Sequence, residues 1–310
     1  MPDTPTTVLT PATANRVATA PISWGICEVP GWGHQLPVHR VLAEMAGLGF
    51  THTELGSAGW LPEEPAALAT VLDEHGLSLL ASFVPLVLHR PEAAEDALAR
   101  AAEAANLLSR LGARYFNTAP VTTYDWAPRT PLTDAEWDHL FAMIGRVEQI
   151  CADAGLHQVV HEHVGCVIET RDDIDRLLAG TEVDLVLDTG HLALGGYDPL
   201  EFATDHGDRV GLVHLKDLDL EVGQRLHDDP MTLMAAVQGG LFPPLGAGDL
   251  PLAKVVATLE AGGYQGWYVV EQDCAITGPA PEIGAGPVLD VADSLSYLER
   301  NITTFSETQE

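Results

Sequence analysis

The chain has 310 residues, of which 46% are hydrophobic and 19% are charged, and its formal net charge is −30. This composition is typical of a folded protein with a large core. The acidic surface repels phosphate backbones and anionic bilayers, so we expect no nucleic-acid partner and no membrane partner. No apolar run approaches the roughly 18–20 residues that a membrane-spanning helix needs.

The two ends of the sequence differ from the rest. Residues 1–19 are rich in Thr, Ala and Pro and lack the basic start and apolar core of a secretion signal, so we expect a flexible N-terminal tail. Residues 306–310 are expected to form a C-terminal tail. The four cysteines lie far apart without CxxC spacing, which is typical of free thiols in a reducing compartment. We therefore expect a cytoplasmic protein with one catalytic domain over residues 20–305, and the sequence leaves a homo-oligomer open.

Short β-like segments alternate with longer helical patterns along the chain. The expected strands are 20–25, 51–56, 77–89, 114–120, 158–165, 183–191, 210–217 and 267–273. The expected helices are 37–49, 63–76, 91–112, 134–155, 170–180, 198–207, 249–263 and 288–302. Thr170 and Asp173 have capping-box spacing at the start of the fifth helix. Eight strand–helix units predict the α/β class and a single (β/α)8 TIM barrel.

Polar side chains gather where the expected strands end, which is where the catalytic groups of such a barrel lie. They are Glu54, His161 to His163, Asp188, His191, His214 to Asp217 and Glu271 to Asp273. Side chains two residues apart share a face of a strand, so His161 and His163 point to one side and Glu162 to the other.

If the first of these faces points to the barrel axis, four consecutive strands each bring one metal ligand there. These ligands are His161, Asp188, His214 and Glu271. Two imidazoles and two carboxylates suit Mn, Co, Fe or Zn better than calcium, and Mg remains compatible with them. The segment LGAGD at 245–249 is most simply a flexible turn, because the helix-leading pattern of phosphate-binding loops is absent.

Three motifs carry a resemblance to a known superfamily. DTGH (188–191), HLKD (214–217) and VVEQD (269–273) resemble, in order and spacing, motifs of the sugar phosphate isomerase/epimerase superfamily of xylose isomerase-like TIM barrels. The resemblance covers the chain from about residue 20 onward. It implies that the metal ligands include the Asp of DTGH, the His of HLKD and the Glu of VVEQD, and that His191 contacts substrate.

The fifth expected strand departs from the ENH pattern that is common in this superfamily. Alignment on Gly165 puts His161 in the place of the metal-binding Glu of that pattern, with Glu162 as the alternative ligand if the register shifts. The resulting HxHxG pattern, together with APISWG (20–25) and TELG (53–56), resembles the inosose dehydratase group of the superfamily.

Membership of that group would imply a metal-dependent lyase of inositol catabolism. Such an enzyme dehydrates a keto-cyclitol by α-proton abstraction and β-hydroxyl elimination through a metal-stabilised enolate. The substrate would be a small-molecule polyol ketone, and Mn or Co would be favoured over Zn, Fe or Mg. We expect Lys216, His163 and His191 to transfer protons or to hold the substrate hydroxyls, and the sequence does not assign base and acid among them. Glu54 and Trp24 are expected to contact substrate beside His191.

Three other functions compete with this one. A metal-dependent isomerase or epimerase of a ketose or cyclitol would use the same fold and metal, and a non-catalytic sugar-binding barrel would keep the pocket without turnover. A metal-dependent endonuclease on the same barrel needs a basic surface, which a net charge of −30 does not supply.

Overall fold

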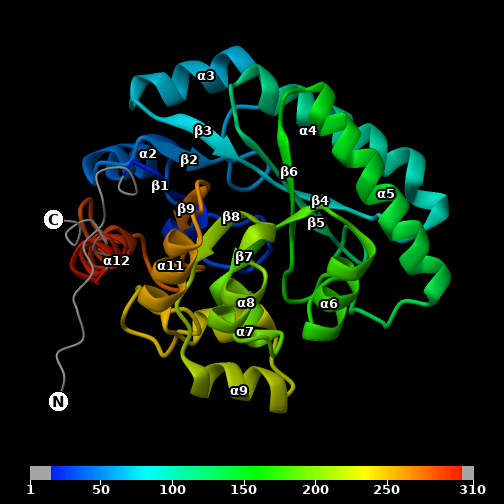
Figure 1. The fold of residues 1–310 in the computed structure, drawn as a ribbon. Helices are drawn as coiled ribbons and strands as arrows, with labels where there is room; N and C mark the ends of the chain where they lie inside the picture. The colour runs from blue at the N-terminus through cyan, green and yellow to red at the C-terminus, as the bar shows by residue number, and fades with distance from the viewer. Residues whose placement is uncertain (1–14, 302–310) are drawn as a thin grey trace, which may run out of the picture.

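The computed structural model describes residues 15–301, and parallel strands run through its centre (Figure 1). The strands are β1 (Val17–Thr19), β2 (His52–Glu54), β3 (Ser78–Ala81), β4 (Phe83–Leu86), β5 (Tyr115–Pro120), β6 (His157–His161), β7 (Asp184–Asp188), β8 (Val210–Leu215) and β9 (Trp267–Val270). All the neighbouring strands pair in parallel, in the order β3-β2-β1-β9-β8-β7-β6-β5-β4.

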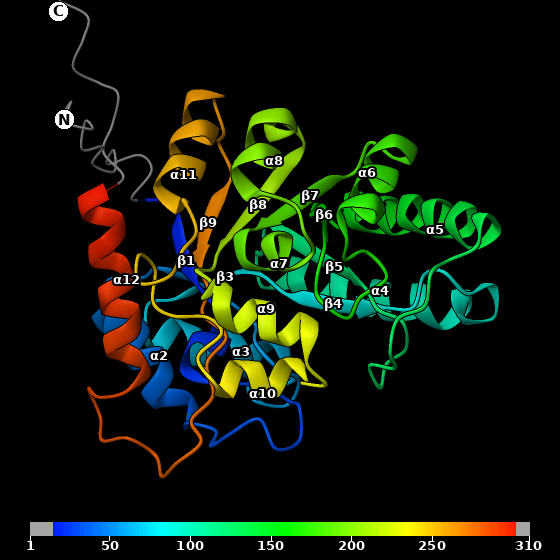
Figure 2. The same cartoon turned by 90° about the horizontal axis from the view of Figure 1, so that it is seen from below.

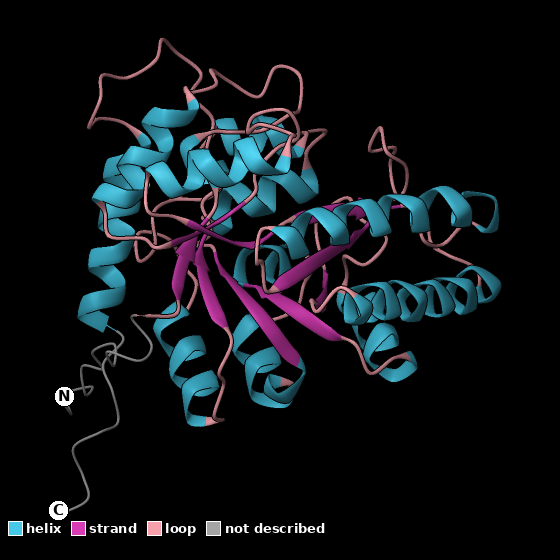
Figure 3. Ribbon diagram, turned by 90° about the horizontal axis from the view of Figure 1, so that it is seen from above, coloured by secondary structure: helices cyan, strands magenta, loops and turns pink. Residues whose placement is uncertain are grey.

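Helices lie around the outside of these strands, as Figure 3 shows. The α-helices are α2 (Val38–Gly47), α3 (Pro65–Glu74), α4 (Ala94–Arg110), α5 (Asp134–Asp153), α6 (Arg171–Gly180), α7 (Thr189–Leu194), α8 (Pro199–Asp205), α9 (Leu220–Asp228), α10 (Leu233–Gln238), α11 (Leu252–Ala261) and α12 (Pro287–Asn301). The 3-10 helices are η1 (Pro21–Trp24), η2 (Pro91–Ala93) and η3 (Gly207–Arg209). Within the described part of the chain, no helix is long and apolar enough to cross a membrane.

The third expected strand, 77–89, is interrupted at Ser82 and appears as β3 and β4 at the two ends of the strand order. The backbone nevertheless continues the sheet across the break, because the N–H of Arg114 donates to Leu80 O at 2.9 Å and that of Asn117 to Ser82 O at 3.1 Å. Counting β3 and β4 as one interrupted strand gives eight strands around a barrel. The predicted α/β class and (β/α)8 architecture are confirmed.

The first expected strand was misplaced by a few residues. β1 lies inside the expected N-terminal tail and pairs with β2 and β9, whereas residues 20–25 contain the 3-10 helix η1. Pro21 explains the shift, because it has no N–H to donate to a sheet and is favoured in the first turn of a helix. Residues 1–14 of the expected tail, and the expected tail at 306–310, lie outside the described residues.

Two helix boundaries depend on capping side chains. The capping box predicted at Thr170 is present at the start of α6, where its side chain accepts the N–H of Asp173 and the Asp173 carboxylate accepts the N–H of Thr170. The expected strand 183–191 ends earlier, at Asp188, because that carboxylate accepts the N–H groups of Gly190 and His191 and so starts α7.

A buried apolar layer fills the interior of the barrel. Its members are Ala18, Ala20, Leu80, Ala81, Tyr115, Val159, Val186, Leu212, Trp267 and Val269. Alternate residues of a strand face the same side. On each of β6 to β9, the residue that lies two positions after the last member of this layer therefore also faces the axis. Those residues are His161, Asp188, His214 and Glu271. The predicted ligands therefore lie directly above an apolar floor.

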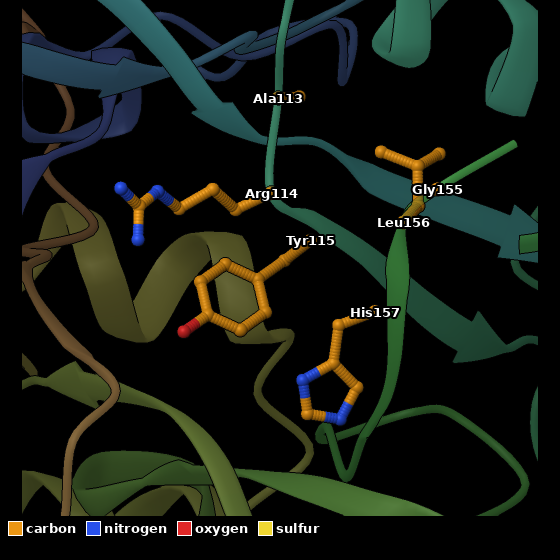
Figure 4. A pocket seen from close by; sticks show the side chains of 6 residues that line it. All are labelled: Ala113, Arg114, Tyr115, Gly155, Leu156 and His157. Atoms are coloured by element: carbon orange, nitrogen blue, oxygen red, sulfur yellow. The ribbon is translucent and has the colours of Figure 1, made fainter. Parts of the chain in front are cut away.

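The opposite end of the barrel carries an open pocket of about 480 Å³ (Figure 4). It is lined by Ala113, Arg114, Tyr115, Gly155, Leu156 and His157. These residues precede or begin β5 and β6, so the pocket lies at the amino ends of the strands and is separate from the predicted site. At the amino end of such barrels, side chains ordinarily serve stability rather than catalysis.

Candidate metal centre and active site

Buried imidazole and carboxylate groups converge at the carboxyl ends of β6 to β9. His161 Nε2 lies 3.7 Å from Asp188 Oδ2, and the same oxygen lies 3.7 Å from His214 Nδ1. His214 Nδ1 also lies 2.8 Å from Glu271 Oε2. The pairing of Asp188 with His214 in the register of β7 and β8 sets two of these groups side by side. All four ligands predicted from sequence therefore lie in one cluster.

The facing atoms of this cluster do not satisfy one another by hydrogen bonds. Both ring nitrogens of His161 lack a hydrogen-bond partner, as do Asp188 Oδ2, His214 Nδ1 and Glu271 Oε2. The short contact between His214 and Glu271 lacks hydrogen-bond geometry. Buried polar atoms without partners are costly, and a shared cation removes that cost. The residues thus fit a divalent metal with mixed nitrogen and oxygen ligands.

Glu54, predicted as a substrate contact, reaches the same cluster from β2. Its Oε1 lies 3.1 Å from His214 Nε2, and Glu54, His214 and Glu271 form a second group whose ligand atoms all lie within 4.8 Å of one another. Burial lowers the pKa of His214, but the carboxylates of Glu271 and Glu54 outweigh it and raise the pKa well above its ordinary value. The site is therefore rich in carboxylates, which favours a bound cation.

Glu162, the alternative ligand, does not join either group of potential ligands among the described residues. Its side chain is fully buried, and its Oε1 accepts the backbone N–H of Asp188 at 3.0 Å. Burial and the nearby Asp188 raise the pKa of Glu162 well above its ordinary value. Strand alternation thus places His161 toward the cluster and Glu162 away from it, against the adjacent strand.

Lys216 brings an ammonium group into the cluster. Its Nζ lies 2.7 Å from Asp273 Oδ1, 3.1 Å from Glu271 Oε2 and 3.4 Å from Asp188 Oδ2. Burial alone would lower the pKa of Lys216, but the three carboxylates outweigh it and raise the pKa well above its ordinary value. Lys216 is therefore positively charged in the protein without metal.

Two neutral imidazoles lie beside Lys216. His191 Nε2 is 3.3 Å from Lys216 Nζ, and the rings of His191 and His163 are 3.7 Å apart between centroids. Burial lowers the pKa of His191 well below its ordinary value and that of His163 to about 3. His163 Nδ1 donates to Val164 O at 2.8 Å, which leaves Nε2 as the unprotonated ring nitrogen.

Trp24 is the one predicted site residue that the structure keeps apart from this cluster. Its indole N–H donates to Glu44 Oε2 of α2 at 3.0 Å, and its fully buried ring packs in the core between strands and helices. Its place in the APISWG motif could not show this, because the motif does not record the distant partner of Trp24, which is Glu44.

Aromatic side chains that the sequence analysis did not select flank the histidines. The Phe83 ring is 5.6 Å from those of His161 and His163, and Trp126 lies 6.3 Å from Phe83 and 6.0 Å from His163. Trp126 has a φ of 57°, a left-handed conformation that is rare for a bulky residue, and it stays partly exposed. Strain of this kind is typical of functional sites. Asp273 was among the polar residues expected at the strand ends but was assigned no role, although its spacing from Glu271 places it on the same face.

Comparisons with known proteins agree with this fold. A family model described as xylose isomerase-like TIM barrel matches residues 42–299. A curated relative from Geobacillus kaustophilus (strain HTA426), named inosose dehydratase, is 34% identical over 278 residues, which cover 85% of this chain and 90% of that protein.

Two solved structures resemble the chain at low sequence identity. The 3-keto-D-glucoside 4-epimerase YcjR from E. coli has a TM-score of 0.64 and 16% identity, over 91% of this chain and 98% of that chain. The IOLI protein with a bound zinc atom has a TM-score of 0.66 and 15% identity, over 93% of this chain and 98% of that chain. These two likenesses bear on the fold alone. The match of the family model across most of the chain goes further: the chain belongs to the xylose isomerase-like TIM barrel family.

Proposed function

We propose that the protein removes water from an inosose, a six-membered polyol ketone, in a reaction that depends on a divalent metal. One observation carries the proposal: the buried ammonium of Lys216 lies between the convergent metal donors and the His191–His163 pair. With a metal bound, this arrangement would set acid and base groups beside an electrophilic centre. The name of the relative from Geobacillus, inosose dehydratase, supports the same reaction.

Four side chains are proposed as the metal ligands, with Glu54 as a fifth donor or a contact to substrate hydroxyls. They are His161, Asp188, His214 and Glu271. A divalent cation held there would polarise the ketone oxygen and stabilise the negative charge that develops on it when the adjacent C–H is deprotonated. We favour Mn or Co, because mixed imidazole and carboxylate ligands suit both ions.

The proton transfers are assigned to three residues of the chain. His163 Nε2, left unprotonated by the bond from Nδ1 to Val164 O, accepts the proton from the carbon next to the ketone. The ammonium of Lys216 protonates the β-hydroxyl, which leaves as water. His191, which accepts from Lys216 and stacks beside His163, orients both groups. The substrate thereby loses one C–H proton and one hydroxide, the elements of a water molecule.

An epimerase is the second candidate, because the same group of metal donors could also serve the removal and return of a proton beside a ketone. Epimerases of this superfamily use one glutamate on each face of the substrate. In this chain the position that faces the cluster from β6 is His161, and Glu162 is turned to the Asp188 backbone. The absence of a second glutamate on that side favours dehydration.

Product analysis with scyllo-inosose separates the two reactions. We expect a dione that absorbs in the ultraviolet to accumulate and the ketone to be consumed, measured by absorbance and by chromatography of the product. A panel of other inososes and ketoses serves as the control for substrate class. Formation of an isomer of equal mass, with no new chromophore, would establish the epimerase instead.

Removal of metal tests the ligand assignment. We expect protein treated with a chelator to lose its turnover and to regain it with Mn or Co, because the ketone would then lack the Lewis acid that polarises it. Metal content before and after treatment is measured by elemental analysis, with dialysis without chelator as the control. Turnover that is the same in metal-free protein would refute the metal requirement.

A further inference from the structure

The LGAGD turn, 245–249, wraps around a carboxylate of the chain itself. Asp217 is fully buried at the end of β8, and its Oδ2 accepts the backbone N–H groups of Gly246 at 2.7 Å and Gly248 at 3.0 Å. Its Oδ1 accepts those of Leu250 at 3.1 Å and Leu218 at 2.9 Å. One carboxylate thus satisfies four backbone donors, three of them from the turn and its exit.

The turn is shaped to hold that carboxylate and no external anion. Gly246 has a φ of 85°, a conformation that favours glycine. A Cβ on Gly248 would lie 2.5 Å from Asp217 Oδ1, so only glycine allows the backbone to approach this closely. The amide groups of Gly246 and Gly248 are therefore already occupied by Asp217.

The same turn fixes the segment that covers the proton-transfer residues. Phe242, three residues before the turn, is buried with its ring centroid 5.9 Å from that of His191 and 5.1 Å from Lys216 Nζ. Its carbonyl accepts the side-chain amide of Gln272 at 3.0 Å. It belongs to a small apolar cluster formed by the α9–α10 insertion, whose two helices lie side by side in Figure 2.

We propose that Asp217 is a positioning residue: by clamping the turn 245–249 it holds Phe242 against His191 and Lys216. Phe242 then excludes water from these two groups and limits the positions that the Lys216 ammonium can take. The proposal rests on the proposed function only for its kinetic consequence. The clamp itself is a property of the fold and has a separate readout.

Asp217→Asn is the sharpest variant, because an amide keeps the size of the side chain but has only one acceptor oxygen for four donors. We expect kcat to fall about 10- to 100-fold, as for a small misplacement of reacting groups, while KM stays nearly constant. Phe242→Ala should lower kcat similarly, and the double variant should be no slower than Phe242→Ala alone. Asp249→Asn is the matched control, because the Asp249 carboxylate accepts a single backbone N–H, that of Leu220, in the same region.

Hydrogen–deuterium exchange of the backbone amides tests the clamp without any substrate. In Asp217→Asn we expect faster exchange both in the turn peptide, 245–250, and in the peptide of α7 that Phe242 covers. Phe242→Ala should accelerate exchange only in α7, and Asp249→Asn should accelerate it in neither peptide.

Unchanged exchange of the turn in Asp217→Asn would overturn the clamp. Unchanged α7 exchange in that variant, or kinetic losses that multiply in the double variant, would overturn its action through Phe242. Wild-type protein inactive on every inosose would refute the proposed function and leave the exchange result to decide the clamp.

Discussion

Replacement of Asp188 by Asn is expected to lower kcat/KM for an inosose by about 10³-fold or more, since metal polarisation is worth several kcal/mol. The same change should lower the amount of metal bound per chain. Asp188 Oδ2 is the atom that faces both His161 and His214, and the amide lacks the charge that these contacts and Lys216 require. Elemental analysis and steady-state kinetics measure the two effects.

Asparagine is preferred to alanine here because Asp188 has a second role in the fold. Its Oδ1 accepts the N–H groups of Gly190 and His191 and caps α7, and an amide oxygen can continue to accept them. Asp184→Asn is the matched control on the same strand, since Asp184 pairs with a half-exposed His157 at the opposite end of the barrel. Full metal content together with near-normal turnover in Asp188→Asn would contradict the assigned centre.

Much of the centre could be predicted from sequence because strand geometry repeats every two residues. The alternation in VVHEHVG places His161 toward the axis and Glu162 away from it, whichever helices pack outside. The same rule carries Asp188, His214 and Glu271 to one end of the barrel once the strands are known to be parallel. These inferences need only local patterns and one topological rule.

Other features depend on contacts between distant parts of the chain, which no local pattern records. Phe242 lies in a long insertion, and its position over His191 is set by the acceptors Asp217 and Ser294, which bind the backbone that follows it. Trp24 was assigned to the pocket from its motif, but its partner is Glu44 in α2. The break of the third strand at Ser82 likewise follows from how β3 and β4 pair on either side, not from composition.

Lys216→Met is expected to lower kcat about 10²- to 10⁴-fold, the usual contribution of a positioned proton donor, with a much smaller change in KM. The substitution should also destabilise metal-free protein by about 3–5 kcal/mol, because it leaves a buried group of carboxylates without its cation. Asp273 loses its 2.7 Å partner, and Asp188 and Glu271 lose one within 3.4 Å. Urea unfolding with and without chelator measures this loss in the free energy of unfolding.

The chain offers a close control, because Lys254 is its only other lysine and lies exposed on α11. Lys254→Met removes the same charge from the same chain and should leave kcat and the free energy of unfolding nearly unchanged. Added metal should recover part of the stability of Lys216→Met, since it restores positive charge among the carboxylates, but not its kcat, since it supplies no proton donor. Recovery of both would mean that Lys216 only balances charge, and the leaving hydroxyl would then need another acid.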